Sequence, residues 1–361
     1  MEALLKVEFP EYVNIQAYAD DIALSIAGPN RRTLIERAEA ALVPVLSWAE
    51  GRGLSFSAQK SSAMLTKGGM VPGFTLAFGE ERIATVECVR YLGILLDQKR
   101  LFSEHLGELK KSSETLFTKL RGTLGSGWGM KRENIATLYR GVFLPKIAYG
   151  ARFWVHTIKT NRAIKTLGSI QRRALLGMTS AYCTTSTDAL QVLAGVPPLD
   201  LEIRWLVLKA EVAMLPNHLR QQSWTDGREE LLDEWQTRWT ATTKGRWTFK
   251  FFPDVRNRLK LPLALGHDVT QFLSGHGNFR AKLAGFNLQP SPLCACEEGE
   301  EDANHVLFDC GLHTVHRAHL ELAVHRAGHL WPCDPIALVS TARTYTALVR
   351  FAKIAAYLER P

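Results

Sequence analysis

Hydrophobic and polar positions near the start of the chain fall into short, strand-length runs. Residues 14–17 form an extended run, and residues 22–27 form an apolar run that predicts a buried strand. Ala-Asp-Asp at 19–21 joins these runs, so the pattern predicts a tight hairpin. Residues 33–49 then carry apolar side chains at helical spacing, and their first residues, from Thr33 to Glu36, have the form of a capping box.

Strand-length runs continue to residue 96, after which the period becomes helical. The runs that predict strands are residues 54–57, 74–78, 82–86 and 88–96. From Ser103 to about Glu234, apolar residues recur at helical spacing, with a break at Pro197 and Pro198. These patterns predict an α+β protein.

The same patterns divide the chain into three predicted domains. Residues 1–100 are rich in strands, and residues 101–234 are helical and basic. Residues 235–361 form a C-terminal region that begins with a second basic and aromatic patch at 235–260. We take that patch as the boundary region that leads to a small C-terminal module.

Composition and charge favour a globular protein with a polyanionic partner. The 361 residues are 46% hydrophobic and 22% charged, with a formal net charge of +8. No Asp or Glu occurs in residues 134–187, where aromatic residues are interleaved with cations. Cations with aromatics between them favour nucleic-acid binding; the alternative is a solvated basic face over a core of ordinary aromatics. The eight cations are Arg140, Lys146, Arg152, Lys159, Arg162, Lys165, Arg172 and Arg173.

Targeting signals and cysteine usage point to an intracellular protein without a membrane partner. No run reaches the ~18 apolar residues that a membrane span needs, and the first residues lack the apolar core of a signal peptide. Three of the six cysteines cluster near the C-terminus. In a chain of this size without a secretory signal, such clustering favours a metal site over disulfides.

Asp20 and Asp21 are the first candidates for chemistry. Two adjacent carboxylates at the tip of an apolar hairpin are costly to bury unless a cation neutralises them. Carboxylate oxygens suit Mg²⁺, and paired metal ions stabilise the attacking and leaving oxygens of a phosphoryl transfer. The alternative is a polar β-turn, because Asp is a common turn residue.

Cys294, Cys296, His305 and Cys310 are the second candidates. Three thiolates and one imidazole are the ligand set of a closed tetrahedral zinc site. The spacing Cys-x-Cys is tighter than the usual two to four intervening residues, so another residue could replace one of these ligands. The possible substitutes are His276, His313, His316 and Cys333.

Three stretches resemble polymerase motifs of reverse transcriptases. Tyr-Ala-Asp-Asp, ending at Asp20 and Asp21, is similar to motif C, in which the aspartates bind catalytic metal. The helical run, Gly-Leu and Lys60 resemble motif D, whose lysine lies near the phosphates of the incoming nucleotide. The sequence around Leu92 and Gly93 resembles motif E, the primer-grip hairpin.

The C-terminal region makes the resemblance specific. Gly-His-Gly-x-Phe at 275–279, followed by Cys-x-Cys-x8-His-x4-Cys, is similar to the end of the Pol polyprotein of type-1 non-LTR retrotransposable elements, which insert into ribosomal RNA genes. The resemblance covers almost the whole chain. It implies a partial reverse-transcriptase palm (motifs C, D and E), a helical thumb and connection, and a C-terminal zinc knuckle.

The resemblance also implies function. It implies RNA-directed DNA polymerase activity primed from a nick in target DNA, with an endonuclease on the same polyprotein. The implied cofactors are Mg²⁺ at Asp20 and Asp21 and Zn²⁺ at the Cys/His cluster, and the implied location is nuclear. Element RNA and target DNA, such as a ribosomal RNA gene, are the implied partners. The candidate contacts to nucleic acid are Leu92, Gly93, Arg140, Lys146, Arg152, Lys159, Arg172 and Arg173.

The sequence departs from the family at its beginning. The motif A aspartate, the fingers and motif B precede motif C in the family, whereas only seventeen residues precede Tyr18 here. We therefore expect this chain to be the C-terminal part of a longer enzyme and not to polymerise DNA alone. No residue after Cys310 is assigned to an endonuclease. The alternative function is a non-enzymatic nucleic-acid-binding relic of a truncated element.

Overall fold

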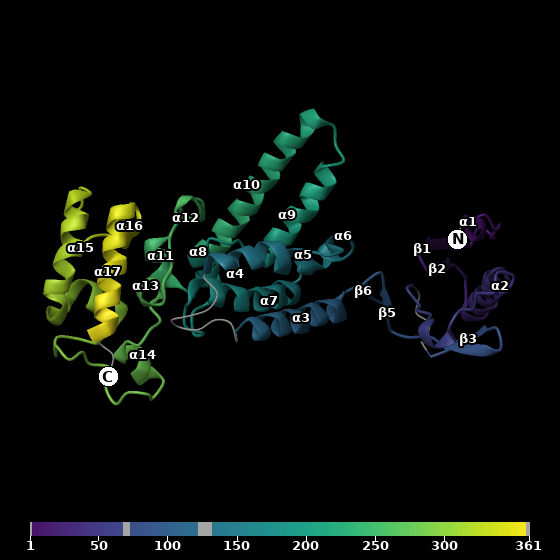
Figure 1. Cartoon of the computed structure of the whole chain (residues 1–361), viewed down its shortest axis with the longest axis horizontal. Coiled ribbons are helices and arrows are strands. Elements are labelled where there is room, and N and C mark those ends of the chain that lie inside the picture. Colours follow the sequence, from purple (N-terminus) through teal and green to yellow (C-terminus); the bar gives the residue numbers. More distant parts are fainter. Residues whose placement is uncertain (1, 68–72, 122–131, 359–361) are drawn as a thin grey trace. The chain divides into compact units, whose positions relative to one another are not determined.

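Two compact units, residues 1–107 and 108–361, make up the chain (Figure 1). The computed structural model describes residues 2–67, 73–121 and 132–358. Helices and strands both occur in this part of the chain, which confirms the predicted α+β class. Within the described ranges, all six strands lie in the first unit and pair as three antiparallel hairpins. None of the described helices is long and apolar enough to cross a membrane.

The first hairpin carries the Asp-Asp pair. A short helix, α1 (Glu2–Leu5), precedes it; β1 (Val13–Tyr18) then pairs with β2 (Asp21–Ile26) as far as Tyr18 opposite Asp21. The turn is therefore the two residues Ala19 and Asp20, and Ala19 has a left-handed φ of 52°. The predicted hairpin is confirmed. The predicted burial of β2 is wrong, because its residues are half-buried or exposed in a sheet of only two strands.

Helix α2 (Arg31–Glu50) packs over the core of the first unit. Its cap is Asn30, whose side chain accepts a hydrogen bond from the backbone N–H of Thr33 at 2.9 Å. The predicted capping box at Thr33 is therefore wrong: the extended backbone at Asn30 starts the helix earlier. Pro44 lies inside the helix, which ends before Gly51. The buried core of this unit consists of Ala38, Ala58, Phe74, Leu76, Phe78 and Ile83.

The remaining strands form two more hairpins. β3 (Thr75–Phe78) pairs with β4 (Glu81–Ala84), and β5 (Cys88–Tyr91) pairs with β6 (Ile94–Asp97). The prediction of one strand over 88–96 is wrong, because Leu92 and Gly93 adopt φ of 45° and 80° and reverse the chain. The predicted strand at 54–57 is also absent; this segment is irregular and leads to a 3-10 turn, η1 (Ala58–Lys60).

The second unit is built around α7 (Asn161–Thr179), whose inward face is fully buried at Leu167, Ala174 and Leu175. A Thr160 side chain caps this helix by accepting from the backbone N–H of Ala163. The neighbouring elements are α3 (Ser103–Arg121), α4 (Arg132–Leu138), the π-helix η2 (Tyr139–Phe143), α5 (Leu144–Ile147), α6 (Ala151–Trp154), the 3-10 helix η3 (Val155–Lys159) and α8 (Thr187–Ala194).

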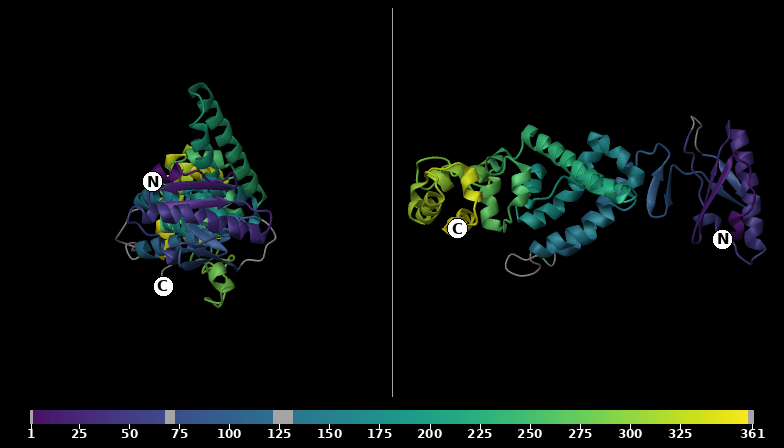
Figure 2. Two further views of the ribbon diagram at one scale, coloured as in Figure 1. Left: turned by 90° about the vertical axis from the view of Figure 1, so that its right-hand side faces the viewer. Right: turned by 90° about the horizontal axis from the view of Figure 1, so that it is seen from above.

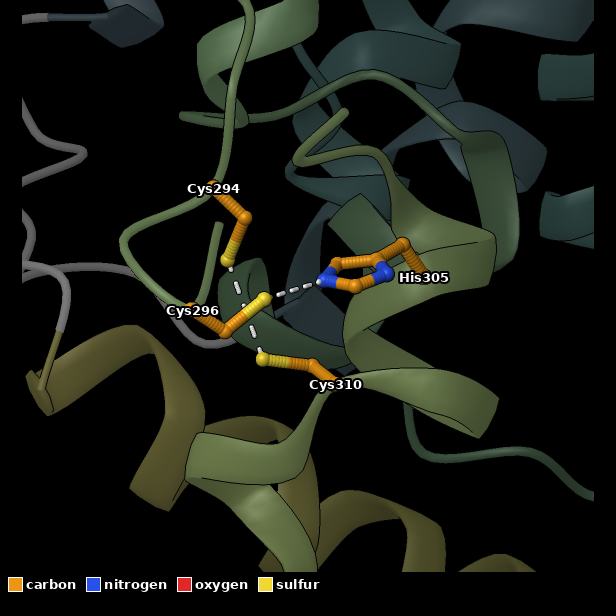
Figure 3. Close-up of side chains that lie close together, drawn as sticks. All are labelled: Cys294, Cys296, His305 and Cys310. Atoms are coloured by element: carbon orange, nitrogen blue, oxygen red, sulfur yellow. Dashed lines mark hydrogen bonds between the residues drawn. The ribbon is translucent and has the colours of Figure 1, made fainter. Parts of the chain in front are cut away.

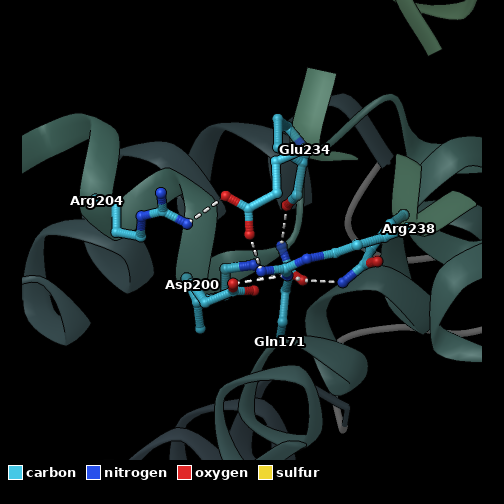
Figure 4. Close-up of polar contacts among 8 residues, drawn as sticks. Gln171, Asp200, Arg204, Glu234 and Arg238 are labelled. Carbon is cyan, nitrogen blue, oxygen red and sulfur yellow. Dashed lines mark hydrogen bonds and ion pairs between the residues drawn. The ribbon is translucent and has the colours of Figure 1, made fainter. Parts of the chain in front are cut away.

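Two long helices, α9 (Leu199–Val212) and α10 (Asn217–Ala241), lie side by side (Figures 1 and 2). They approach closely at Gly227, where a Cβ atom would lie 2.1 Å from the Leu208 Cδ2 atom. Polar contacts join them as well (Figure 4): Arg238 Nη1 bonds Asp200 Oδ2 at 2.7 Å, and Arg204 Nη1 bonds Glu234 Oε2 at 2.6 Å. The predicted domain boundary after Glu234 thus falls inside a continuous helix.

The aromatic residues after this boundary form a hydrophobic core. Trp235, Trp239, Phe251 and Phe252 are each at most 2% exposed and pack with α8, α13, α15 and α17. The rings of the basic and aromatic patch at 235–260 are therefore buried or half-buried, and its cations do not share one environment, because Arg258 is only 5% exposed. The C-terminal elements are α11 (Arg246–Phe251), α12 (Val255–Lys260), α13 (His267–Ser274), α14 (Arg280–Gly285), the π-helix η4 (His305–Asp309), the 3-10 helix η5 (Gly311–His313), α15 (Thr314–Arg326), α16 (Pro335–Val339) and α17 (Ala342–Leu358).

Candidate metal and nucleic-acid sites

The Asp-Asp pair lies at the tip of the β1–β2 hairpin. Asp20 occupies the turn, Asp21 is the first residue of β2, and both are exposed. Tyr18, opposite Asp21, is 66% exposed. Exposed carboxylates pay no desolvation cost, so burial gives no argument for a metal in this unit. Their accessibility does suit a hydrated hard cation such as Mg²⁺, which keeps several of its waters.

The motif D and motif E candidates lie on the same unit. Lys60 is exposed at the end of η1, two residues after the buried Ala58. Leu92 and Gly93 form the turn of the β5–β6 hairpin, in which Gly93 is exposed and Leu92 is half-buried. The glycine therefore does not lie inside a strand, as the sequence pattern suggested, but at a turn that needs a left-handed backbone.

The four Cys/His candidates come together in the second unit. Cys294, Cys296, His305 and Cys310 point toward one another (Figure 3), and their ligand atoms all lie within 4.8 Å of one another. Cys294 Sγ lies 3.7 Å from Cys310 Sγ, and Cys296 Sγ lies 3.2 Å from His305 Nε2. Two sulfurs bound to one tetrahedral zinc ion would be about 3.8 Å apart, from a Zn–S distance of ~2.3 Å. The donor set and its spacing therefore fit Zn²⁺.

A tight loop allows Cys294 and Cys296 to point to the same place although only one residue separates them. The backbone N–H of Cys294 bonds the Gly299 carbonyl at 2.8 Å, and an antiparallel bridge joins Leu293 to Glu300. Glu297 takes a left-handed φ of 65°, and the N–H of Glu298 points at Cys296 Sγ from 3.4 Å. The loop thus folds Cys296 back toward Cys294.

A π-helix brings the last two candidate ligands, His305 and Cys310, together. The N–H of Cys310 bonds the carbonyl of His305 at 2.7 Å, a bond between residues five apart that is typical of a π turn. This wide turn brings both side chains to the same place. The proposed substitutes are not in the cluster; His276, for example, hydrogen-bonds Thr184 through Nδ1 at 3.0 Å.

Three further residues support this centre, and ligand spacing could not identify them. The Asp302 side chain accepts from the N–H of His305 at 2.8 Å, and Glu301 pairs with Arg280 at 3.4 Å. Arg317, 4% exposed, donates through Nη2 to the Cys310 carbonyl at 2.9 Å. A zinc ion with three thiolates carries a net negative charge, so a buried guanidinium beside it is favourable. Nothing in the sequence distinguishes this arginine, because other charged residues and histidines surround it in α15.

The thiols of this cluster differ in acidity. Burial raises the pKa of Cys294 to about 12 and also raises the pKa of Cys310. The backbone N–H of Glu298 lowers the pKa of Cys296 by stabilising its thiolate. Because zinc binds thiolates, metal binding must release protons from the two buried thiols.

The cations of residues 134–187 do not all share one environment. Arg140, Lys146, Arg152, Lys159 and Arg173 are exposed. The exception among the candidates is Arg172, which donates to the Cys183 carbonyl at 2.5 Å, the Thr185 carbonyl at 2.7 Å and Thr187 Oγ1 at 3.0 Å. Its guanidinium thus holds the loop after α7 through three protein acceptors.

The aromatic residues of the same stretch divide into two groups. Tyr139 and Phe143 are 1% exposed and stack on each other at 5.0 Å, and Trp154 is fully buried. Tyr149 and Phe153 are 58% and 66% exposed. The buried group follows the alternative prediction of core aromatics, and the exposed group is accessible to a ligand. Tyr182, the remaining aromatic residue of the stretch, is half-buried.

The Gly-His-Gly-Asn-Phe segment at 275–279 binds to the loop after α7. Tyr182 Oη donates to Asn278 Oδ1 at 2.7 Å, in addition to the contact between His276 and Thr184 described above. A Cβ atom at Gly277 would lie 2.4 Å from Gln271 Oε1, the atom that accepts from the Asn278 N–H. The motif thus joins the loop after α7 to the segment that leads to the Cys/His cluster.

Comparisons with known proteins give a consistent picture. The chain is 33% identical over 350 residues to the putative 115 kDa protein in type-1 retrotransposable element R1DM of Drosophila melanogaster, covering 92% of this chain and 34% of that protein. It is 31% identical over 352 residues to the retrovirus-related Pol polyprotein from type-1 retrotransposable element R1 3 of Nasonia vitripennis, covering 90% and 92%.

A more distant relative has a polymerase name. The chain is 25% identical over 203 residues to the RNA-directed DNA polymerase from mobile element jockey of Drosophila funebris, covering 55% of this chain and 21% of that protein. No protein-family model and no solved structure matches the chain. The chain therefore spans about a third of the length of the 115 kDa protein but most of the length of the Nasonia protein.

Proposed function

The chain belongs to the Pol polyproteins of type-1 R1 non-LTR retrotransposable elements, and we propose that it supplies part of an RNA-directed DNA polymerase that copies element RNA at a nicked target DNA. The observation that carries this proposal is the exposed Asp20-Asp21 pair at the tight turn of the β1–β2 hairpin, in a chain of this family. The polymerase name of the jockey relative supports it.

Asp20 and Asp21 are the proposed ligands for catalytic Mg²⁺. Carboxylate oxygens suit this ion, which would lower the barrier to phosphoryl transfer by stabilising the charge that develops on the oxygens. We assign Lys60 to the phosphates of the incoming nucleotide, where an exposed cation stabilises the same charge. We assign Leu92 and Gly93, at the β5–β6 turn, to the primer strand.

We propose that this chain works within a longer polypeptide and is inactive alone. Two carboxylates and a substrate leave a two-metal site short of one bridging ligand. The match to only 34% of the 115 kDa protein supports a larger whole. We also propose a nuclear location, and an endonuclease associated with the full polyprotein, for which this chain offers no assigned residue.

Primer extension on an RNA template tests the polymerase proposal. The purified chain should incorporate no nucleotide, and a longer polyprotein that contains it should. Asp20→Asn and Asp21→Asn should each abolish extension in the longer protein. Glu80→Gln, at the exposed β3–β4 turn, is the matched control and should leave extension unchanged. Activity of the longer protein that survives Asp20→Asn would overturn the metal assignment, and extension by this chain alone would overturn its inactivity.

The second unit is the proposed nucleic-acid-binding part, with element RNA and target DNA as partners. The exposed cations Arg140, Lys146, Arg152, Lys159 and Arg173 support this role, because no acidic residue lies between 134 and 187. Affinity for an RNA–DNA duplex should fall steeply with salt concentration, since each phosphate contact releases counterions.

Charge reversal makes the salt experiment specific. Lys146→Glu with Arg152→Glu should weaken binding and flatten the slope of log affinity against log salt. Lys209→Glu with Lys353→Glu, two exposed lysines on α9 and α17, is the control with the same change in net charge. An equal loss in both proteins would show that net charge alone, and not this surface, drives binding.

A further inference from the structure

We propose that Tyr149 and Phe153 form a stacking platform for unpaired bases, so that the second unit binds single-stranded nucleic acid in preference to duplex. The inference rests on the nucleic-acid binding proposed above and adds the class of ligand. It follows from two exposed aromatic rings that flank an exposed arginine, within a stretch of the sequence (134–187) that contains no acidic residue.

The exposure of the two rings is selective. Three aromatic residues of the same stretch, Tyr139, Phe143 and Trp154, are at most 1% exposed, whereas Tyr149 is 58% and Phe153 is 66% exposed. An apolar ring left in water forgoes the free energy that burial supplies. The unit therefore has a hydrophobic core beside these residues, and two rings that do not enter it.

The backbone holds the two rings in place. Gly150, between them, has a left-handed φ of 61° that allows the chain to turn from α5 into α6. The N–H of Phe153 bonds the Gly150 carbonyl at 3.0 Å. The indole of the fully buried Trp154 donates to the Tyr149 carbonyl at 3.3 Å. A core residue thus anchors the turn that presents the rings, which reduces the entropy lost on binding.

The surrounding charge identifies the ligand. Lys146 precedes Tyr149 by three residues, and Arg152 lies directly before Phe153; both cations are exposed. Aromatic faces between cations match a strand whose bases stack while its phosphates pair with lysine and arginine. A duplex offers the phosphates but not the base faces, because its bases stack on one another. The geometry therefore favours single strands, such as an unpaired part of the element RNA.

The affinities of the chain for two probes, compared between variants, test the platform. The probes are a single-stranded oligouridine and an RNA–DNA duplex of equal length, measured by fluorescence anisotropy against the full chain. Tyr149→Ala with Phe153→Ala should lower the affinity for the single strand at least tenfold, because each lost base stack is worth about five- to a hundredfold. Affinity for the duplex, and the salt slope for the single strand, should stay unchanged because no charge is removed.

Two control proteins complete the experiment. Tyr149→Trp with Phe153→Trp should retain single-strand binding, because the rings are kept. Met214→Ala removes an 80% exposed apolar side chain outside the basic stretch and should have no effect. All these positions are exposed, so the substitutions should leave the fold intact.

The outcomes distinguish the stacking platform from the proposed nucleic-acid binding on which it rests. Unchanged single-strand affinity in the double alanine protein would overturn the stacking platform, as would an equal loss for single strand and duplex. If Lys146→Glu with Arg152→Glu still lowers affinity in that case, the basic nucleic-acid surface survives without the platform. If that charge reversal changes nothing either, both proposals fail.

Discussion

Replacing Glu202 by Gln should stabilise the second unit, and the gain should grow with pH. Glu202 lies on α9 and accepts a hydrogen bond from the hydroxyl of Tyr139, which in turn accepts from Gln171 Nε2 at 2.9 Å. Burial raises the pKa of Glu202 to about 7, although the Tyr139 hydrogen bond and the charges of Arg228 and Arg140 oppose this rise. The carboxylate is therefore a poorly solvated anion in the folded chain at neutral pH.

The size of the effect follows from the two pKa values. The unfolded chain ionises Glu202 near its ordinary value of 4.5, but the folded chain ionises it only near 7. Folding stability is thus lost as pH rises between these values, because the folded state then holds the extra proton. A difference of about 2.5 units at ~1.4 kcal/mol each amounts to about 3.5 kcal/mol above pH 8. At pH 5.5 the loss is only about 1.4 kcal/mol.

Urea unfolding at the two pH values measures this gain. Glu202→Gln keeps an oxygen that can accept from Tyr139, so the variant should exceed the wild-type free energy of unfolding by about 2 kcal/mol more at pH 8.5 than at pH 5.5. Glu211→Gln, exposed on the same helix, should show no such pH dependence. The reasoning is refuted if the gain from Glu202→Gln is equal at both pH values.

Three other predictions concern the Cys/His cluster, Arg172 and Gly277. Cys310→Ser should abolish binding of one zinc ion per chain, measured by atomic emission, whereas Cys333→Ser should retain it, because Cys333 is outside the cluster. Arg172→Ala should destabilise the second unit by about 2 kcal/mol in urea unfolding, because it leaves three acceptors without their charged donor; exposed Arg173→Ala should leave stability unchanged. Gly277→Ala should lower the free energy of unfolding by about 1–3 kcal/mol, measured by urea unfolding, since the new Cβ would lie 2.8 Å from Gln271 Cβ and 2.9 Å from the Phe279 ring.

Elements set by local chemistry could be predicted from the sequence. The β1–β2 hairpin follows from two short runs separated by Ala-Asp-Asp, and the structure places its turn at Ala19 and Asp20. The four Cys/His candidates were identified because few residue types bind zinc, even though the Cys-x-Cys spacing was unusual. What made that spacing workable, a left-handed Glu297 and a π turn at His305, leaves no pattern in the sequence.

Burial of individual side chains could not be predicted in the same way. A run of aromatics among cations has the same composition whether the rings face solvent or the core. Trp239 lies in the core because α10 continues past Glu234, so that its ring contacts Phe249 of α11 and its indole donates to the Phe252 carbonyl. Local periodicity does not reveal such contacts. Arg172 likewise has a partner loop, residues 183–187, that only the folded chain identifies.

The attachment of the Gly-His-Gly segment has a consequence for how the second unit would respond to a protease. Residues 270–278 reach back to residues 179–184 through side-chain hydrogen bonds, including Thr270 to the Thr179 carbonyl at 2.8 Å. Between these two stretches, Met214 is an 80% exposed residue at the turn that connects α9 to α10. A chain cut there would remain one noncovalent body, so an intact elution volume in gel filtration would not show that the polypeptide is uncut.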